Sequence, residues 1–179
     1  GTDLTQSDMV SLISKQINSF RLPHDTNGIY VIITSADIAS TTTGFCSPSV
    51  PPLHGQGIVN GIITKYIFLG DPNRCPSVAG PQFSPSGPTP NDNYTADVLV
   101  SNLAHAINGS VTNPLGNGWY DRYGFENTDK CQDALGHPAF GQTYLTANGA
   151  RANVRIGPRD FLIQQNWVND RKARCAMSQ

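Results

Sequence analysis

Four widely spaced cysteines in a chain rich in glycine and proline constrain the fold more than any other feature. They are Cys46, Cys75, Cys131 and Cys175. No C-x-x-C spacing occurs, so the pattern supports neither a zinc knuckle nor a thioredoxin-type motif. The even count suggests two disulfides, for which three connectivities exist. We favour Cys46–Cys75 with Cys131–Cys175, since each pair closes a loop of moderate length over a turn-rich stretch. The alternative is four reduced, buried thiols.

Two N-glycosylation sequons agree with an oxidising, secretory route. Asn93 begins the sequence Asn-Tyr-Thr, and Asn108 begins Asn-Gly-Ser, and both match N-x-[ST]. Together with the cysteines they lead us to expect a secreted, extracellular glycoprotein. The sequence opens at Gly1 without a signal peptide, so we expect that a leader was removed or lies outside it.

Charge and length exclude several classes of protein. The chain has 179 residues, the length of one domain spanning 1–179, and 12 Lys and Arg against 13 Asp and Glu give a net charge of -1. This balance, without a basic run, argues against nucleic acid as a partner. No stretch approaches the ~20 apolar residues that cross a bilayer, so we expect no membrane span.

Hydrophobic periodicity predicts an α+β fold with a small mixed sheet, two main helices and long disulfide-anchored loops. Apolar residues at helical spacing indicate the two helices, and β-branched or alternating runs indicate strands. The first strand is uninterrupted and apolar, so we expect it to be buried on both faces. Six prolines in one stretch predict a long loop without helix or central strand. The expected helices are 6–19 and 95–107, the strands 29–34, 61–69, 143–145, 153–156 and 161–168, and the loop 70–92, with Gly109 and Pro114 ending the second helix.

The histidines and acids give only weak candidates for chemistry. His105 lies in the second predicted helix, but Ala106 stands where a helical zinc peptidase needs a glutamate as general base. His54 follows two prolines and is expected to be a structural loop residue. Asp121, Glu126 and Asp129 form an oxygen-rich segment without the EF-hand pattern, which favours a solvated loop over a calcium site.

An aromatic pair is the remaining candidate for ligand binding. Trp119 and Tyr120, with Tyr123 nearby, lie in a turn-rich segment. Aromatic side chains of this kind stack on sugar rings, although such clusters are more often part of a core. A carbohydrate-binding module is therefore one alternative for the function.

Two motifs resemble a known family. Residues 30–37 (Tyr-Val-Ile-Ile-Thr-Ser-Ala-Asp) precede Gly44-Phe45-Cys46, and residues 111–120 read Val-Thr-Asn-Pro-Leu-Gly-Asn-Gly-Trp-Tyr. In this order they resemble the EXORDIUM/phosphate-induced family, secreted plant proteins linked to growth and the cell wall. The likeness runs from about residue 5 to the end and corresponds to the later part of the family domain. It implies that an N-terminal portion of that domain is absent.

A more distant resemblance bears on mechanism. Zincin-like metallopeptidases carry H-E-L-A-E-A-x-T-D-P followed by G-x-G-W-Y-D. In this alignment His105 takes the first histidine, Ala106 the catalytic glutamate, Gly109 the second acidic position and Asn113 the aspartate. One of the four polar positions is kept, which implies a degenerate active site, a pseudoenzyme and no cofactor.

These observations predict a secreted, glycosylated, non-catalytic protein with a binding or structural role at the cell wall. An uncovered sheet edge and a surface with few charges would favour self-assembly into oligomers or fibrils. The partners we expect are therefore other copies of the chain or extracellular glycans. The alternative is a metal-dependent hydrolase that uses His105 with Asp121 or Asp129.

Overall fold

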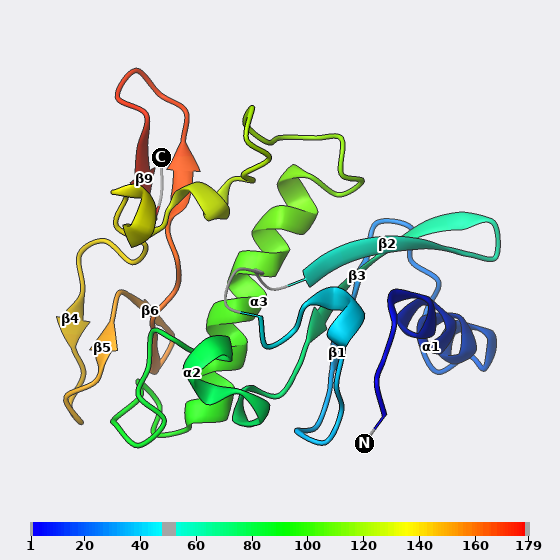
Figure 1. Ribbon diagram of the computed structural model, residues 1–179, viewed down its shortest axis with the longest axis horizontal. Coiled ribbons are helices and arrows are strands. Elements are labelled where there is room, and N and C mark those ends of the chain that lie inside the picture. The colour runs from blue at the N-terminus through cyan, green and yellow to red at the C-terminus, as the bar shows by residue number, and fades with distance from the viewer. Residues whose placement is uncertain (1, 48–52, 178–179) are drawn as a thin grey trace.

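The computed structural model describes residues 2–47 and 53–177, and it has the predicted α+β architecture. The long helix α3 lies between a three-stranded sheet and a series of small C-terminal hairpins (Figure 1). The helices are α1 (Gln6–Asn18), α2 (Pro76–Ala79) and α3 (Tyr94–Thr112), and the short 3-10 helices are η1 (Thr41–Thr43), η2 (Pro72–Arg74), η3 (Thr128–Lys130) and η4 (Asp133–Leu135). The strands are β1 (Ile29–Ile33), β2 (Leu53–Val59), β3 (Ile62–Leu69), β4 (Tyr144–Leu145), β5 (Arg151–Ala152), β6 (Val154–Ile156), β7 (Arg159–Phe161), β8 (Asn166–Val168) and β9 (Arg174–Ala176).

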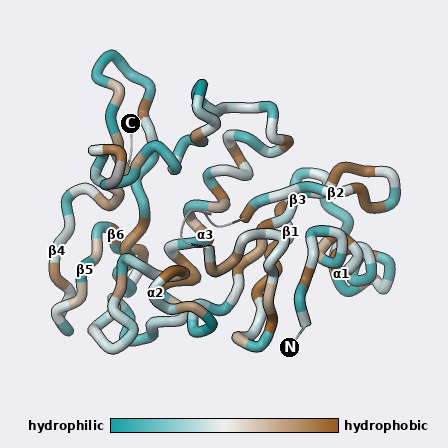
Figure 2. The backbone as a smooth tube through the Cα atoms, viewed as in Figure 1, coloured by the Kyte–Doolittle hydropathy of each residue, from teal (hydrophilic) through white to brown (hydrophobic). Residues whose placement is uncertain are grey.

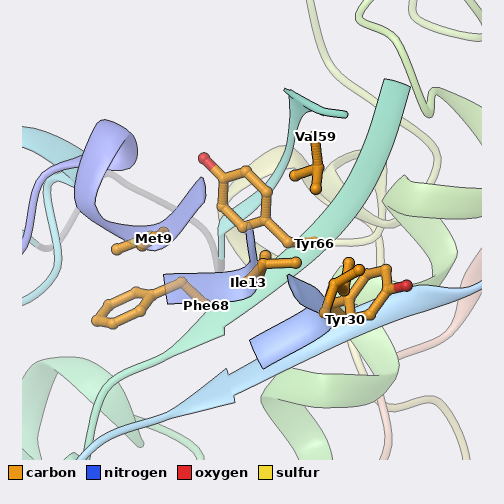
Figure 3. Close-up of a cluster of buried hydrophobic side chains, with 7 residues drawn as sticks. Met9, Ile13, Tyr30, Val59, Tyr66 and Phe68 are labelled. Carbon is orange, nitrogen blue, oxygen red and sulfur yellow. The ribbon is translucent and has the colours of Figure 1, made fainter. Parts of the chain in front are cut away.

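The sheet is mixed and β3 is its central strand. The strand order is β1-β3-β2, with β1 parallel and β2 antiparallel to β3. Helix α1 packs on one face, where it meets alternate residues of all three strands (Figure 3). This cluster consists of Met9, Ile13, Ile17, Tyr30, Val59, Tyr66 and Phe68. Helix α3 covers part of the other face through Ala106, which packs with Ile67 and Leu69.

The expectation that the first strand is buried on both faces was wrong. Strand β1 is an edge strand, and Val31 and Ile33 are 44% and 59% exposed. Both lie on the face that α3 covers only in part. Figure 2 shows apolar colour along this strand at the margin of the sheet. An uninterrupted apolar run therefore did not distinguish a central strand from an edge strand.

Strand β2 was missed because of its glycines. An added Cβ at Gly55 would lie 2.8 Å from the Tyr66 ring, and one at Gly57 would lie 2.3 Å from Val10. These close approaches require glycine, which lowers the intrinsic preference for a strand. Because this strand was not predicted, we expected His54 in a loop, but His54 lies on β2.

Other element boundaries also needed correction. Segment 70–92 contains η2 and the single turn α2 but is otherwise irregular. Helix α3 ends at Thr112, because Gly109 continues the helix and does not terminate it. The predicted strand 161–168 is interrupted, so that its ends belong to β7 and β8. Strands β5 and β9 were not predicted.

The two disulfides have the connectivity that the sequence favoured. Cys46 pairs with Cys75, and Cys131 pairs with Cys175. The first joins the segment after η1 to the start of α2, and the second joins the segment after η3 to β9. No helix within residues 2–47 and 53–177 combines the length and apolarity that a membrane crossing needs.

Candidate functional site

His105 lies midway along α3, where the side chain of Gln164 fixes its ring. Asn93 caps the start of the helix, and its side chain accepts the backbone N–H of Ala96 in the first turn. The Gln164 amide nitrogen donates to the carbonyl oxygens of Thr128 and Cys131 at 2.9 Å and 2.7 Å. Gln164 Oε1 therefore faces His105 Nδ1, 2.8 Å away, as an acceptor. It follows that Nδ1 carries a proton and donates a hydrogen bond to Gln164 Oε1.

The other ring nitrogen of His105 faces a carboxylate. Asp129 Oδ1 lies 3.2 Å from His105 Nε2, and Asp129 Oδ2 accepts the backbone N–H of Glu126 at 3.2 Å. Burial raises the pKa of Asp129, but the hydrogen bond and charge of His105 and the Glu126 N–H together hold that pKa below its ordinary value. In the imidazolium form, the Nδ1–H of His105 donates to Gln164 and its Nε2–H faces Asp129 Oδ1 in an ion pair, whose geometry falls short of a regular hydrogen bond.

A second histidine–carboxylate pair, His54 and Glu126, packs against α3 at Gly109, one helical turn beyond His105. His54 Nε2 lies 2.8 Å from Glu126 Oε2, and the Asn113 amide donates to Glu126 Oε1 at 2.7 Å. Asn113 Oδ1 in turn accepts the Gly118 N–H at 2.6 Å. An added Cβ at Gly109 would lie 2.6 Å from the His54 ring and 2.9 Å from Glu126 Oε2. Glycine at 109 therefore makes room for this pair against the helix.

The acidic segment does not converge as a metal site. Asp121 forms an ion pair with Lys130 at 3.0 Å, while Glu126 and Asp129 contact different histidines. The hydrogen bond from Lys130 and those from two backbone N–H groups hold the pKa of Asp121 below its usual value, against an opposing effect of burial. Within the described part of the chain, no group of three or more His, Cys, Asp or Glu side chains could hold a metal ion.

The aromatic candidates lie outside this network. The Trp119 backbone N–H donates to the Thr112 carbonyl, and the side chain of Trp119 is half-buried. Tyr120 is 53% exposed, and Tyr123 stacks with Arg122. Among residues 2–47 and 53–177, neither Trp119 nor Tyr120 forms an aromatic pair. Trp119 and Tyr120 therefore remain separate candidate side chains for the carbohydrate-binding alternative.

The two sequon asparagines differ in their surroundings. Asn93 is exposed at the start of α3, and its side-chain oxygen caps the helix. The amide nitrogen, to which a glycan is attached, takes no part in this capping bond. Asn108 lies inside α3 and is half-buried, and its side-chain oxygen is buried without a partner among the described residues. Asn93 is therefore the more accessible acceptor for a glycan.

A cavity of about 600 Å³ adjoins His105 and was not expected from the sequence. Segments far apart in the sequence line it: the stretch around Cys46, the start of β2, the end of β3, α2 with the loop after it, one side of α3 and several stretches of the C-terminal part. His105 and Gln164 form part of its wall. No local motif predicts such a cavity, because its lining is assembled from residues far apart in the sequence.

Comparisons with known proteins place the chain in a family. A family model described as the phosphate-induced protein 1 conserved region matches residues 1–178. Protein EXORDIUM of Arabidopsis thaliana is 37% identical over 123 residues, covering 62% of this chain and 38% of the relative. Protein PHOSPHATE-INDUCED 1 of Nicotiana tabacum is 31% identical over 134 residues, covering 67% and 40%.

A longer match covers nearly the whole chain. Protein EXORDIUM-like 5 of Arabidopsis thaliana is 29% identical over 196 residues, which cover 97% of this chain and 53% of the relative. The chain thus spans between two fifths and about half of the length of these relatives. No solved structure matches the chain. On the family model and these relatives, the chain belongs to the EXORDIUM/phosphate-induced family.

Proposed function

We propose that this protein is a secreted, glycosylated, non-catalytic module that binds or organises material at the cell wall. The observation that carries the proposal is the internal pairing of both histidines of the site. His105 contacts Gln164 and Asp129, and His54 contacts Glu126. Ala106 is buried against the sheet, so a proton acceptor at that position would have to lie among apolar side chains. Because the side chains of both histidines are already paired with other side chains of the protein, we favour a structural role for them.

Two features support an extracellular location. Both disulfides close long loops in a chain with few charged side chains, and such bonds persist in oxidising compartments. The sequon at Asn93 lies on the surface, where a glycan causes no packing conflict. A glycan there would also add solubility that the few charged residues do not supply.

Metal analysis of the purified, secreted protein tests the absence of catalysis. We expect no stoichiometric zinc in the wild-type protein, and the same result for His105→Ala. A full equivalent of zinc that disappears in His105→Ala would overturn the proposal. His137→Ala serves as the matched control, because His137 packs edge-on against the Trp167 ring, with ring centroids 5.0 Å apart.

A metal-dependent hydrolase is the second candidate, and one observation favours it. His105 lines a cavity, and Asp129 lies 3.2 Å from its Nε2. A histidine in a cavity wall that is paired with a carboxylate is an arrangement that acid–base hydrolysis uses. The hydrolase reading predicts that Asp129→Asn abolishes peptide or ester hydrolysis by a protein that keeps its fold.

Self-assembly is part of the proposed role, and the outer edge of β1, which pairs with no other described strand, supports it. The strand reads Ile-Tyr-Val-Ile-Ile, without the charge or proline that usually protects an edge. We expect concentration-dependent oligomers in size-exclusion chromatography and a monomer for Val31→Lys. A wild-type monomer at millimolar concentration would remove this part of the proposal.

A further inference from the structure

The cavity beside His105 is almost free of charge. His105 and Asp133 are its ionisable lining residues within the described part of the chain. The ring nitrogens of His105 already face Gln164 and Asp129. Asp133 is exposed, and its Oδ1 accepts the Ala139 N–H at 3.1 Å. An anionic ligand would find no free positive charge among these described lining residues, and an unpaired charge is costly to remove from water. The carboxylate that faces a cation, Asp133, is exposed to water, which weakens its attraction for one.

Side-chain amides replace charges in the lining. Asn102 donates its amide N–H to the Ala79 carbonyl, and this bond leaves its Oδ1 as an acceptor. Gln82 and Gln132 also line the cavity, and neither side chain hydrogen-bonds to another described residue. An amide offers two donors and a carbonyl acceptor. The lining therefore presents donors and acceptors together, in an arrangement that suits hydroxyl groups, which both donate and accept.

Apolar surface completes the cavity. Phe45 and Phe140 belong to its wall, together with Leu53 and Val78. The Phe45 ring is held edge-on against Phe68, with ring centroids 5.8 Å apart. Gly70 permits this position, since a Cβ there would lie 2.2 Å from the Phe45 ring. A ligand that fits must combine hydroxyl groups with C–H surface and carry no net charge.

We propose that this cavity binds a short, neutral oligosaccharide. Sugar rings present hydroxyl groups at their edges and C–H groups on their faces, and these match the amides and the phenyl rings of the lining. The volume of about 600 Å³ falls within the ~300–1,000 Å³ of small-molecule sites. This inference rests on the proposed non-catalytic function, of which it names the ligand class.

Calorimetric titration of the glycosidase-treated, full chain tests this inference. The probes are cellotetraose, mannotetraose and xyloglucan heptasaccharide, with tetragalacturonic acid as the charged counterpart and N-acetyl-tetra-alanine amide as a neutral peptide. We expect at least one neutral saccharide to bind and the galacturonate to bind at least tenfold more weakly. Gln132→Leu removes one amide and should weaken binding about five- to tenfold, whereas Ala139→Trp fills the cavity and should abolish it.

The control variants lie outside the cavity. Gln6→Leu repeats the amide removal at an exposed position, and Tyr120→Ala removes the exposed aromatic ring, so both should bind like the wild-type protein. Saccharide binding that survives Gln132→Leu and Ala139→Trp but is lost in Tyr120→Ala would overturn the assignment. So would binding of the peptide alone, or no binding of any neutral saccharide. Hydrolysis of a bound saccharide would instead refute the proposed absence of catalysis.

Discussion

Gly109→Ala is the most direct test of how the histidine–carboxylate network packs against α3. In an exposed helix interior, alanine is about 1 kcal/mol more favourable than glycine. Here the new Cβ would lie 2.6 Å and 2.7 Å from two atoms of the His54 ring. The ring must therefore move, and its 2.8 Å contact with Glu126 is lost.

The lost contact outweighs the gain in helix propensity. A hydrogen bond to a charged group such as the Glu126 carboxylate contributes about 1.5–3 kcal/mol, and overpacking adds about 1–3 kcal/mol where the neighbours cannot relax. The side chains of His54 and Glu126 are 17% and 21% exposed, so the lower part of both ranges applies. We expect Gly109→Ala to lower the free energy of unfolding by about 2 kcal/mol, or Tm by roughly 4–8 °C for a chain of this size.

A double-mutant cycle separates the clash from other effects. Urea unfolding, followed by far-ultraviolet circular dichroism, gives the free energy of unfolding for wild type, Gly109→Ala, His54→Ala and the double variant. Without the His54 ring, the alanine gains its helical preference, so Gly109→Ala should stabilise the His54→Ala protein by up to ~1 kcal/mol. If Gly109→Ala stabilises the wild-type protein, or destabilises both backgrounds equally, the packing argument is refuted.

Three further predictions concern charge, glycosylation and the disulfides. Because the pKa of Asp129 is lowered in the folded protein, its carboxylate stabilises the fold above the unfolded pKa of about 3.9. This stabilisation is lost as pH falls through the lower, folded pKa. Urea midpoints measured from pH 5 to pH 2 should therefore fall less steeply for Asp129→Asn than for the wild-type protein, and equal slopes would contradict this. Mass spectrometry of the protein secreted from a eukaryotic host should find one N-glycan, at Asn93. Asn93→Asp, which keeps a capping oxygen, should remove it, whereas Asn108→Gln should leave the mass of the glycan unchanged. Replacing Cys131 and Cys175 by alanine opens a loop with a sequence separation of 44 residues and should cost about 4 kcal/mol on the chain-entropy model, so a urea midpoint within error of wild type would exclude a stabilising role for this disulfide.

Short-range sequence patterns predicted the main helices and strands, because each of these is determined by residues close together in the chain. The first helix follows from Thr5 and Asp8, which form a reciprocal capping box, and from Met9, Ile13 and Ile17 on one face. The strand around Tyr66 follows from alternating residues that separate two faces. The even number of separated cysteines predicted two disulfides, and loop length favoured the pairing that the structure has.

Tertiary contacts explain the elements that were missed or misplaced. Gly55 and Gly57 weaken the local strand signal of β2, yet they permit the approach of Tyr66 and Val10. Gly109 suggests a helix end in the sequence, but it continues α3 because His54 and Glu126 occupy the space of a side chain. In each case the glycine is explained by a partner distant in sequence.

The site shows the same division. From the sequence, His105 was a helical histidine without the partners of a zinc peptidase, and Asp129 was one of three acids in a loop. Only the fold brings Asp129 within 3.2 Å of His105, assigns Glu126 to His54 and places Gln164 on the remaining ring nitrogen. These contacts join segments separated by tens of residues, so no local spacing encodes them.

The sequence by itself determined the α+β class, the two long helices, the disulfide count and the family resemblance, because each depends on periodicity, composition or a contiguous motif. The tertiary structure decided which histidine meets which carboxylate, which strand lies at the sheet edge and where a cavity with few ionisable groups opens. Those properties depend on distances between side chains from different segments, and such distances are fixed only when the helices and strands pack together.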